Sequence, residues 1–89
     1  MDQAIILVWG HVQGVFYRSS AKKKANTLNI SGYAKNLSSG EVEILAQGQR
    51  ENIEQFIEWC REGPSAANVD RVEVSWQPAG EILDHFDIK

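Results

Sequence analysis

A short segment with two glycines, residues 10–18, separates two patterns of different period near the start of this 89-residue chain. The unbroken apolar run before it, residues 4–9, predicts a buried strand over residues 3–9. Apolar residues recur after it at helical spacing and predict a helix over residues 18–28. Strand, glycine-bearing loop and helix therefore follow one another directly.

The loop and the start of the helix together have the features of a phosphate-binding site. Gly10 and Gly14 allow the backbone to curl, because glycine takes positive φ without strain, and successive N–H groups can then point at one spot. The first N–H groups of the helix have no intrahelical acceptor, and the helix dipole is positive there. Arg18 adds a planar guanidinium that binds two phosphate oxygens at once. Ser19 is interpreted as a capping residue, with phosphate contact as the alternative.

Charge is distributed unevenly along the chain. Residues 1–35 carry five basic side chains and one acidic one, whereas residues 36–89 carry four basic and eleven acidic ones. The half that contains the proposed phosphate cradle is therefore cationic within a net charge of −3, which favours the approach of a small anion. The simpler interpretation of the run from Lys22 to Lys24 is a solvated helix face.

Composition limits the class of protein. One cysteine excludes both an intrachain disulfide and a cysteine-based zinc site. No run has transmembrane length, and the start of the chain lacks the basic and apolar segments of a signal peptide. With 43% hydrophobic residues the chain can close a modest core. We therefore expect one soluble, cytoplasmic domain over residues 1–89, a monomer without metal, cofactor, nucleic-acid partner or membrane partner.

Two further strands are predicted before the middle of the chain. Residues 31–37 form the first, and the sequence Leu37-Ser38-Ser39-Gly40 is typical of a turn. Alternation of apolar and polar residues predicts the next strand over residues 41–47. Its inward residues would be Val42, Ile44 and Ala46, and its outward residues Glu41, Glu43 and Gln47.

The second half of the chain adds a helix and two strands. Four apolar residues at i, i+3, i+4 and i+7 predict the helix, which the pair Gly63-Pro64 ends. A strand with one apolar face and a short final strand follow. The residues that carry these patterns are Ile53, Phe56, Ile57 and Cys60 for the helix, Val72, Val74 and Trp76 for the strand, and Phe86 and Ile88 for the final strand.

The order β-α-β-β-α-β predicts an α+β fold, a ferredoxin-like α/β sandwich with a short extra C-terminal strand. Two helices would cover one face of an antiparallel sheet, with strand 41–47 inserted between strands 3–9 and 31–37. Strands 3–9 and 31–37 would then run in the same direction and end at the same edge of the sheet. Asn36 would thereby lie beside Arg18, although an asparagine before a turn is more often a turn residue.

Two segments resemble the two signatures of the acylphosphatase family. The glycine-bearing loop carries the first, the strand–turn–strand segment carries the second, and residues near the end of the chain fit the same pattern. The resemblance covers essentially the whole chain. Its residues are Gly10, Val12, Gln13, Gly14, Val15 and Arg18; Gly32, Tyr33, Asn36, Gly40, Val42 and Glu43; and Gly63, Pro64, Ala67, Val69, Val72, Trp76, Phe86 and Ile88.

This resemblance implies hydrolysis of an acyl phosphate, a carboxylic–phosphoric anhydride, to a carboxylate and inorganic phosphate. It implies that Arg18 binds the phosphoryl group and that Asn36 holds the attacking water. It also implies the ferredoxin-like fold. The backbone of the loop would complete the phosphate-binding site with residues Gln13, Gly14, Val15, Phe16 and Tyr17.

So sparse a set of residues suits an activated substrate. The leaving carboxylate has a conjugate acid of pKa roughly 4 and needs no general acid. A loose phosphoryl-transfer transition state asks mainly for positioning and charge stabilisation. No general base is evident, so we expect the substrate's own phosphate to take the proton. The proposed site has no carboxylate that would bind a metal ion, which argues against phosphate monoesters. No acyl pocket is visible, so several acyl phosphates should be accepted.

Other functions fit the sequence less well. An RNA-binding module of this topology needs aromatic residues on its central strands, and residues 41–47 contain none. A metal-carrying module would need a Cys-x-x-Cys pair after the first strand, which is absent. The remaining alternative is a non-catalytic module that binds or senses phosphate or an acyl phosphate. Measured turnover of an acyl phosphate would distinguish such a module from an enzyme.

Structural roles are predicted for most other conspicuous residues. Cys60 should fill the core near the C-terminal end of its helix, where a thiolate is disfavoured. His85 is interpreted as a surface residue with no evident partner. His11 is interpreted as an exposed loop residue, with general base as the alternative. Trp9 and Trp76 are both expected to face the core.

Overall fold

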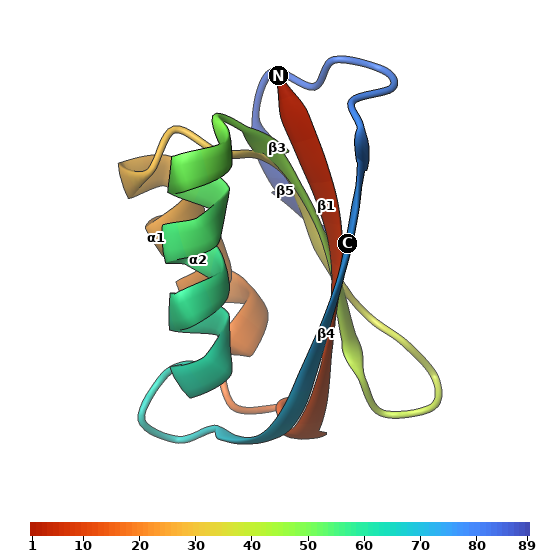
Figure 1. The fold of residues 1–89 in the computed structure, drawn as a ribbon. Helices are drawn as coiled ribbons and strands as arrows, with labels where there is room; N and C mark the ends of the chain where they lie inside the picture. The colour runs from red at the N-terminus through yellow and green to blue at the C-terminus, as the bar shows by residue number, and fades with distance from the viewer.

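The computed structural model describes residues 1–89 and contains the predicted elements in the predicted order. Both helices lie against one face of a five-stranded sheet (Figure 1), so the ferredoxin-like α/β sandwich is confirmed. Neither helix is long and apolar enough to cross a membrane. The elements are β1 (Asp2–His11), α1 (Tyr17–Thr27), β2 (Ser31–Asn36), β3 (Val42–Gly48), α2 (Arg50–Glu62), β4 (Asn68–Pro78) and β5 (Phe86–Ile88).

The strands lie in the order β4-β1-β3-β2-β5. β3 is antiparallel to both of its neighbours, so β1 and β2 run in the same direction, as predicted. The four strands β4, β1, β3 and β2 are antiparallel to their neighbours, as expected. The short extra strand β5 pairs with β2 in parallel, so the complete sheet is mixed. The reason is that β4 ends beside Asp2, at the edge where β2 also begins, and the chain crosses along this edge before it enters β5.

One hydrophobic core fills the space between the sheet and the two helices. The inward positions predicted for β3 and the predicted apolar face of α2 all contribute to it. The predicted face of β4 packs against the same core, partly buried, because that strand lies at an edge of the sheet. The core residues of the central strands and α2 are Ala4, Ile6, Val8, Val42, Ile44, Ala46, Ile53, Phe56, Ile57 and Cys60.

Trp9 does not belong to this core, contrary to expectation. Alternation along β1 places Ala4 and Val8 on the helix side, so Trp9 falls on the opposite face of the sheet. There the guanidinium of Arg71 lies 4.1 Å from the centroid of its ring. Residues 4–9 are all apolar, so the sequence shows no alternation that would indicate which face of the sheet Trp9 occupies. Trp76, in contrast, pairs with Ala4 and packs against the core as expected.

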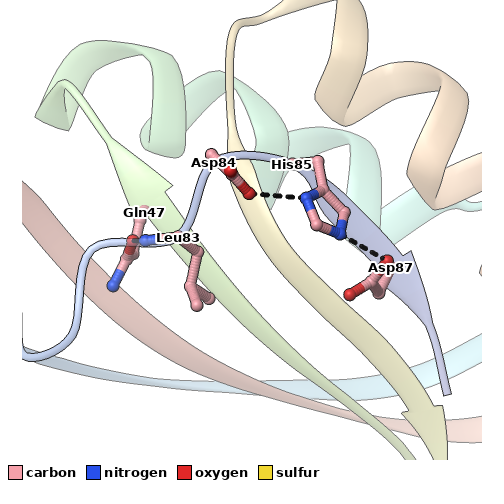
Figure 2. A network of polar contacts seen from close by, with 5 residues as sticks. All are labelled: Gln47, Leu83, Asp84, His85 and Asp87. Atoms are coloured by element: carbon pink, nitrogen blue, oxygen red, sulfur yellow. Dashed lines mark hydrogen bonds and ion pairs between the residues drawn. The ribbon is translucent and has the colours of Figure 1, made fainter.

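The segment from residue 79 to residue 85, here called the strap, crosses from β4 to β5 over the outward side of the sheet (Figure 1). Gln47 faces outward as predicted, yet it is buried because the strap covers it. Its amide donates to the main-chain oxygen of Glu81 at 2.6 Å and to Oε1 of Gln3 at 2.8 Å. Its own Oε1 accepts the N–H of Leu83 at 2.9 Å (Figure 2).

The end of the strap carries a histidine between two carboxylates, which Figure 2 shows. Nδ1 of His85 lies 2.6 Å from Oδ1 of Asp84, and Nε2 lies 3.0 Å from Oδ1 of Asp87. His85 is exposed as predicted, but the expectation that it has no partner is wrong. The hydrogen bond with Asp84 and the charge of Asp87 raise the pKa of His85 above its ordinary value.

Candidate active site

A pocket of about 310 Å³ lies where the end of β1, the N-terminus of α1 and the ends of β2 and β5 meet. The topology brings these segments together because β1 and β2 are parallel and β5 pairs with β2. Arg18 and Asn36 line this pocket together, as the predicted strand order requires. Its lining residues are Val12, Gly14, Phe16, Tyr17, Arg18, Ser19, Asn36 and Ile88.

The loop leaves β1 through backbone conformations that favour glycine. Gly10 has φ of 132°, and a Cβ there would collide with the main-chain oxygen of Asn68. Gly14 has φ of 77°, and Phe16 has φ of 65° in the left-handed region, where an aromatic residue is rare. The chain therefore curls tightly before α1 begins at Tyr17.

The backbone N–H groups of this curled segment are not used by the rest of the protein. From residue 13 to residue 19, none donates a hydrogen bond to another main-chain group. The N-terminus of α1 also has no side-chain cap, because the hydroxyl of Ser19 donates to the main-chain oxygen of Phe16 instead of accepting from an N–H group. Free N–H donors at the positive end of a helix dipole are the usual arrangement for binding an anion.

The guanidinium of Arg18 is held at the mouth of the pocket by a single contact. Its Nη1 donates to the main-chain oxygen of Lys89 at 2.7 Å in an exposed position. That contact occupies one of the five N–H donors of the guanidinium and leaves the others for a ligand. It also links the first turn of α1 to the residue after β5.

Asn36 has a carbonyl oxygen that nothing in the protein satisfies. Its Oδ1 is buried and accepts no hydrogen bond. In an Asx turn this oxygen would accept a backbone N–H two residues further along the chain. The turn is closed instead by main-chain bonds, from N–H of Leu37 to Glu41 at 2.9 Å and from N–H of Gly40 to Leu37 at 3.1 Å. The interpretation of Asn36 as a turn-forming side chain is therefore wrong.

Two of the five residues predicted to complete the cradle do not line the pocket. Val15 is buried in the core. Gln13 instead donates two hydrogen bonds from its side-chain amide, to the main-chain oxygens of Leu37 at 2.8 Å and Glu41 at 2.9 Å. Sequence reasoning considered only the backbone of Gln13 and missed this link between the loop and the turn after Asn36.

Tyr17 anchors the start of α1 to the end of α2. Its side chain is buried, and its hydroxyl donates to the main-chain oxygen of Cys60 at 2.7 Å. Its ring also lies 5.3 Å from that of Trp59, centroid to centroid. Burial raises the pKa of Tyr17 far above its ordinary value and that of the Cys60 thiol to about 12. Both side chains are therefore neutral at physiological pH, and Cys60 is part of the core as predicted.

Comparison with known proteins now decides the family. The family model described as acylphosphatase matches residues 4–88. The chain belongs to the acylphosphatase family. An acylphosphatase from Thermus thermophilus is 49% identical over 76 residues, which cover 85% of this chain and 86% of that protein. An acylphosphatase from an Anaeromyxobacter species is 41% identical over 89 residues, covering 100% and 96%.

Solved structures agree with the sequence relatives. The crystal structure of acylphosphatase from Bacillus subtilis matches with a TM-score of 0.97 at 32% sequence identity. The match covers 100% of this chain and 99% of that chain. The family resemblance and the fold inferred from the residues are thus both confirmed.

Proposed function

We propose that the chain hydrolyses acyl phosphates to a carboxylate and inorganic phosphate in the pocket that Arg18 and Asn36 line. The chain belongs to the acylphosphatase family over nearly its whole length, which supports this activity. The observation that carries the proposal is the convergence of a guanidinium, a set of free backbone N–H groups and an unpartnered amide oxygen on one small pocket.

Arg18 and the loop would bind the phosphoryl group. The guanidinium supplies a planar pair of donors for two phosphoryl oxygens, and the backbone N–H groups from Gly14 to Tyr17 supply further donors for the rest. Negative charge on those oxygens persists through a loose transition state, so donors fixed in advance stabilise it without reorganisation. In this proposal the phosphate-binding residues are Gln13, Gly14, Val15, Phe16, Tyr17 and Arg18. The side chains of Gln13 and Val15 hold the loop in place, because the first bonds to the turn after Asn36 and the second is buried in the core.

Asn36 would position the attacking water by accepting one of its protons in a hydrogen bond at Oδ1. The water oxygen forms a bond to phosphorus, and the bond between phosphorus and the acyl oxygen breaks with its electron pair. The carboxylate leaves unprotonated because its conjugate acid has a pKa of roughly 4. The proton of the water passes to a phosphoryl oxygen, so inorganic phosphate is released and no protein base is needed.

The proposal extends to the organisation of the protein. We propose that residues 1–89 form one acylphosphatase-like domain, since one sheet and one core include all the elements. We further propose that the domain works as a monomer in the cytoplasm and that its reaction needs no metal ion or cofactor.

Hydrolysis of benzoyl phosphate by the purified chain in EDTA tests this proposal. We expect Arg18→Ala and Asn36→Ala each to lower kcat/KM by roughly 10²–10³-fold, the usual cost of losing a preorganised contact. Matched controls are Arg61→Ala and Asn26→Ala, which remove the same side chains from the exposed helix surface. Circular dichroism checks that each variant is folded.

The possible results separate the alternatives. Turnover lost in both site variants and kept in both controls supports the enzyme and the two roles. Loss in Arg18→Ala alone leaves the phosphate site and removes the role of Asn36. A wild-type chain that binds phosphate through Arg18 without hydrolysing benzoyl phosphate is a non-catalytic binding module.

A further inference from the structure

The pocket has an apolar rim formed by the side chains of Phe16 and Ile88. We propose that this rim binds the acyl group of the substrate and favours aromatic and other apolar acyl phosphates over small or charged ones. The inference rests on the proposed function, since it assigns the part of the same pocket that the phosphoryl group does not occupy.

Large apolar side chains are seldom exposed on this protein, and two of them meet here. Phe16 is 79% exposed and Ile88 is 44% exposed, and both line the pocket. A single exposed apolar residue needs no explanation. Two of them, 72 positions apart in the sequence, converge on the opening that also contains Arg18 and Asn36. A pocket that combines apolar side chains with a few convergent polar groups is typical of a ligand site.

The backbone conformation of Phe16 is a second, independent indication that its ring contacts a ligand. Its φ of 65° lies in the left-handed region, which costs a non-glycine residue conformational energy. Burial in the core could compensate for such strain, but this ring is largely in solvent. Glycine would take the same conformation without strain. The folded state alone therefore gives no reason for an aromatic ring at this position, whereas contact with a substrate does.

Each rim residue adjoins one of the residues proposed to act on the phosphoryl group. Phe16 stands two positions before Arg18, at the N-cap of α1. Ile88 pairs with Ala34 in β2, two positions before Asn36. The acyl carbon of the substrate is one oxygen atom away from phosphorus. A phosphoryl group held by Arg18 therefore directs the acyl group to the mouth of the pocket, where the rim lies.

The chemistry of the lining residues indicates which acyl groups fit. Arg18 is the one charged side chain among them, and the phosphoryl group engages it. An acyl group with a charge of its own would lose hydration against Phe16 and Ile88 without gaining a counter-charge. An aromatic acyl group would instead gain ring-to-ring contact with Phe16 and apolar contact with Ile88. The preference should be moderate because the rim is open to solvent.

The test compares benzoyl phosphate with acetyl phosphate, which differ in the size of the apolar acyl group. The readout is the ratio of the two kcat/KM values in wild type, Phe16→Ala and Ile88→Ala. We expect each substitution to lower the ratio by about three- to tenfold, the range expected for one aromatic or apolar contact. Ile82→Ala is the matched control: it removes an equally apolar, 63% exposed side chain from the strap, and the ratio should stay at the wild-type value.

A second measurement separates the ring of Phe16 from the loop that carries it. Competitive inhibition by inorganic phosphate, which has no acyl group, reports the state of the phosphate-binding loop alone. Phe16→Leu should restore part of the lost ratio because it returns apolar area. If Phe16→Ala weakens phosphate and both substrates by the same factor, the ring acts through the loop and the inference is overturned.

The outcomes for the inference and for the proposed function differ. Turnover of both substrates with a ratio that neither rim variant changes overturns the apolar rim and leaves the acylphosphatase activity standing. A wild-type chain that hydrolyses neither substrate overturns the proposed function, and the inference falls with it.

Discussion

The side-chain amide of Gln13 donates a 2.8 Å hydrogen bond to the main-chain oxygen of Leu37, the residue directly after Asn36. A second bond, to the main-chain oxygen of Glu41, joins the same amide to the other side of the turn. The loop that carries the free N–H groups and the strand end that carries Asn36 are therefore tied together by one side chain. We therefore expect Gln13 to act as a positioning residue.

Substitution of Gln13 tests this link. Gln13→Ala should lower the free energy of unfolding by about 1 kcal/mol, because both carbonyls keep a main-chain donor. It should lower kcat/KM by on the order of tenfold, since displacement of catalytic groups is costly. Gln13→Glu should be worse than Gln13→Ala, because its carboxylate cannot donate and faces two carbonyl oxygens. Denaturant unfolding and benzoyl phosphate kinetics measure the two effects, with exposed Gln55→Glu as control. Equal kinetics in Gln13→Glu and wild type would contradict the role.

Removal of the hydroxyl of Tyr17 tests the anchor between the two helices. Tyr17→Phe leaves the main-chain oxygen of Cys60 without its buried donor and should cost about 1–3 kcal/mol of stability. Tyr33→Phe removes a hydroxyl that bonds to Glu43 at 2.8 Å in a partly exposed position, and water can replace that bond. Thermal unfolding of the two variants should therefore show a clearly larger loss for Tyr17→Phe. A loss in Tyr33→Phe as large as that in Tyr17→Phe would count against the anchor.

Cys60 should be chemically silent in the folded protein. Its side chain is fully buried and burial raises the pKa of its thiol to about 12, so almost no thiolate is present at pH 8. We expect no reaction with an excess of a disulfide reagent such as dithionitrobenzoate under native conditions, and complete reaction of one thiol in guanidinium chloride. Labelling at a similar rate in both conditions would mean that α2 opens readily.

His85 should make the strap sensitive to pH. The Asp84 hydrogen bond and the Asp87 charge raise its pKa in the folded state, so protonation and folding favour each other. This stabilisation is fully present below the unfolded-state pKa of roughly 6.5 and disappears as the pH rises through the higher folded-state pKa. A proton NMR titration should show that Asp84→Asn brings the His85 transition back toward its ordinary pH. An unchanged transition in Asp84→Asn would contradict the assigned cause.

The fold could be predicted because its periodic segments are unambiguous. The spacing of Ile53, Phe56, Ile57 and Cys60 and the alternation from Val42 to Ala46 each specify one element and one buried face. Trp9 was assigned to the wrong face because an apolar run carries no alternation. The parallel direction of β5 was missed because it depends on the path of the strap, which has no periodic pattern.

Part of the site could be predicted from the sequence for a related reason. Arg18 and Asn36 could be brought together from strand order alone, because topology determines which strand ends share an edge. The side-chain bonds of Gln13, the burial of Gln47 and the partners of His85 depend on the paths of loops. No local pattern in the sequence encodes such contacts. Phe16 was counted only for its backbone, since exposure of a ring cannot be read from residue type.

The pocket combines residues from the first loop, the end of β2 and the last strand, so no continuous fragment of the chain contains it. A refolding chain must therefore complete the pairing of its last strand, β5 on β2, before the first substrate molecule can be turned over. Recovery of hydrolytic activity during refolding therefore reports the completion of the fold. The tryptophan fluorescence signal, which responds to partial collapse, can recover earlier than the activity but not later.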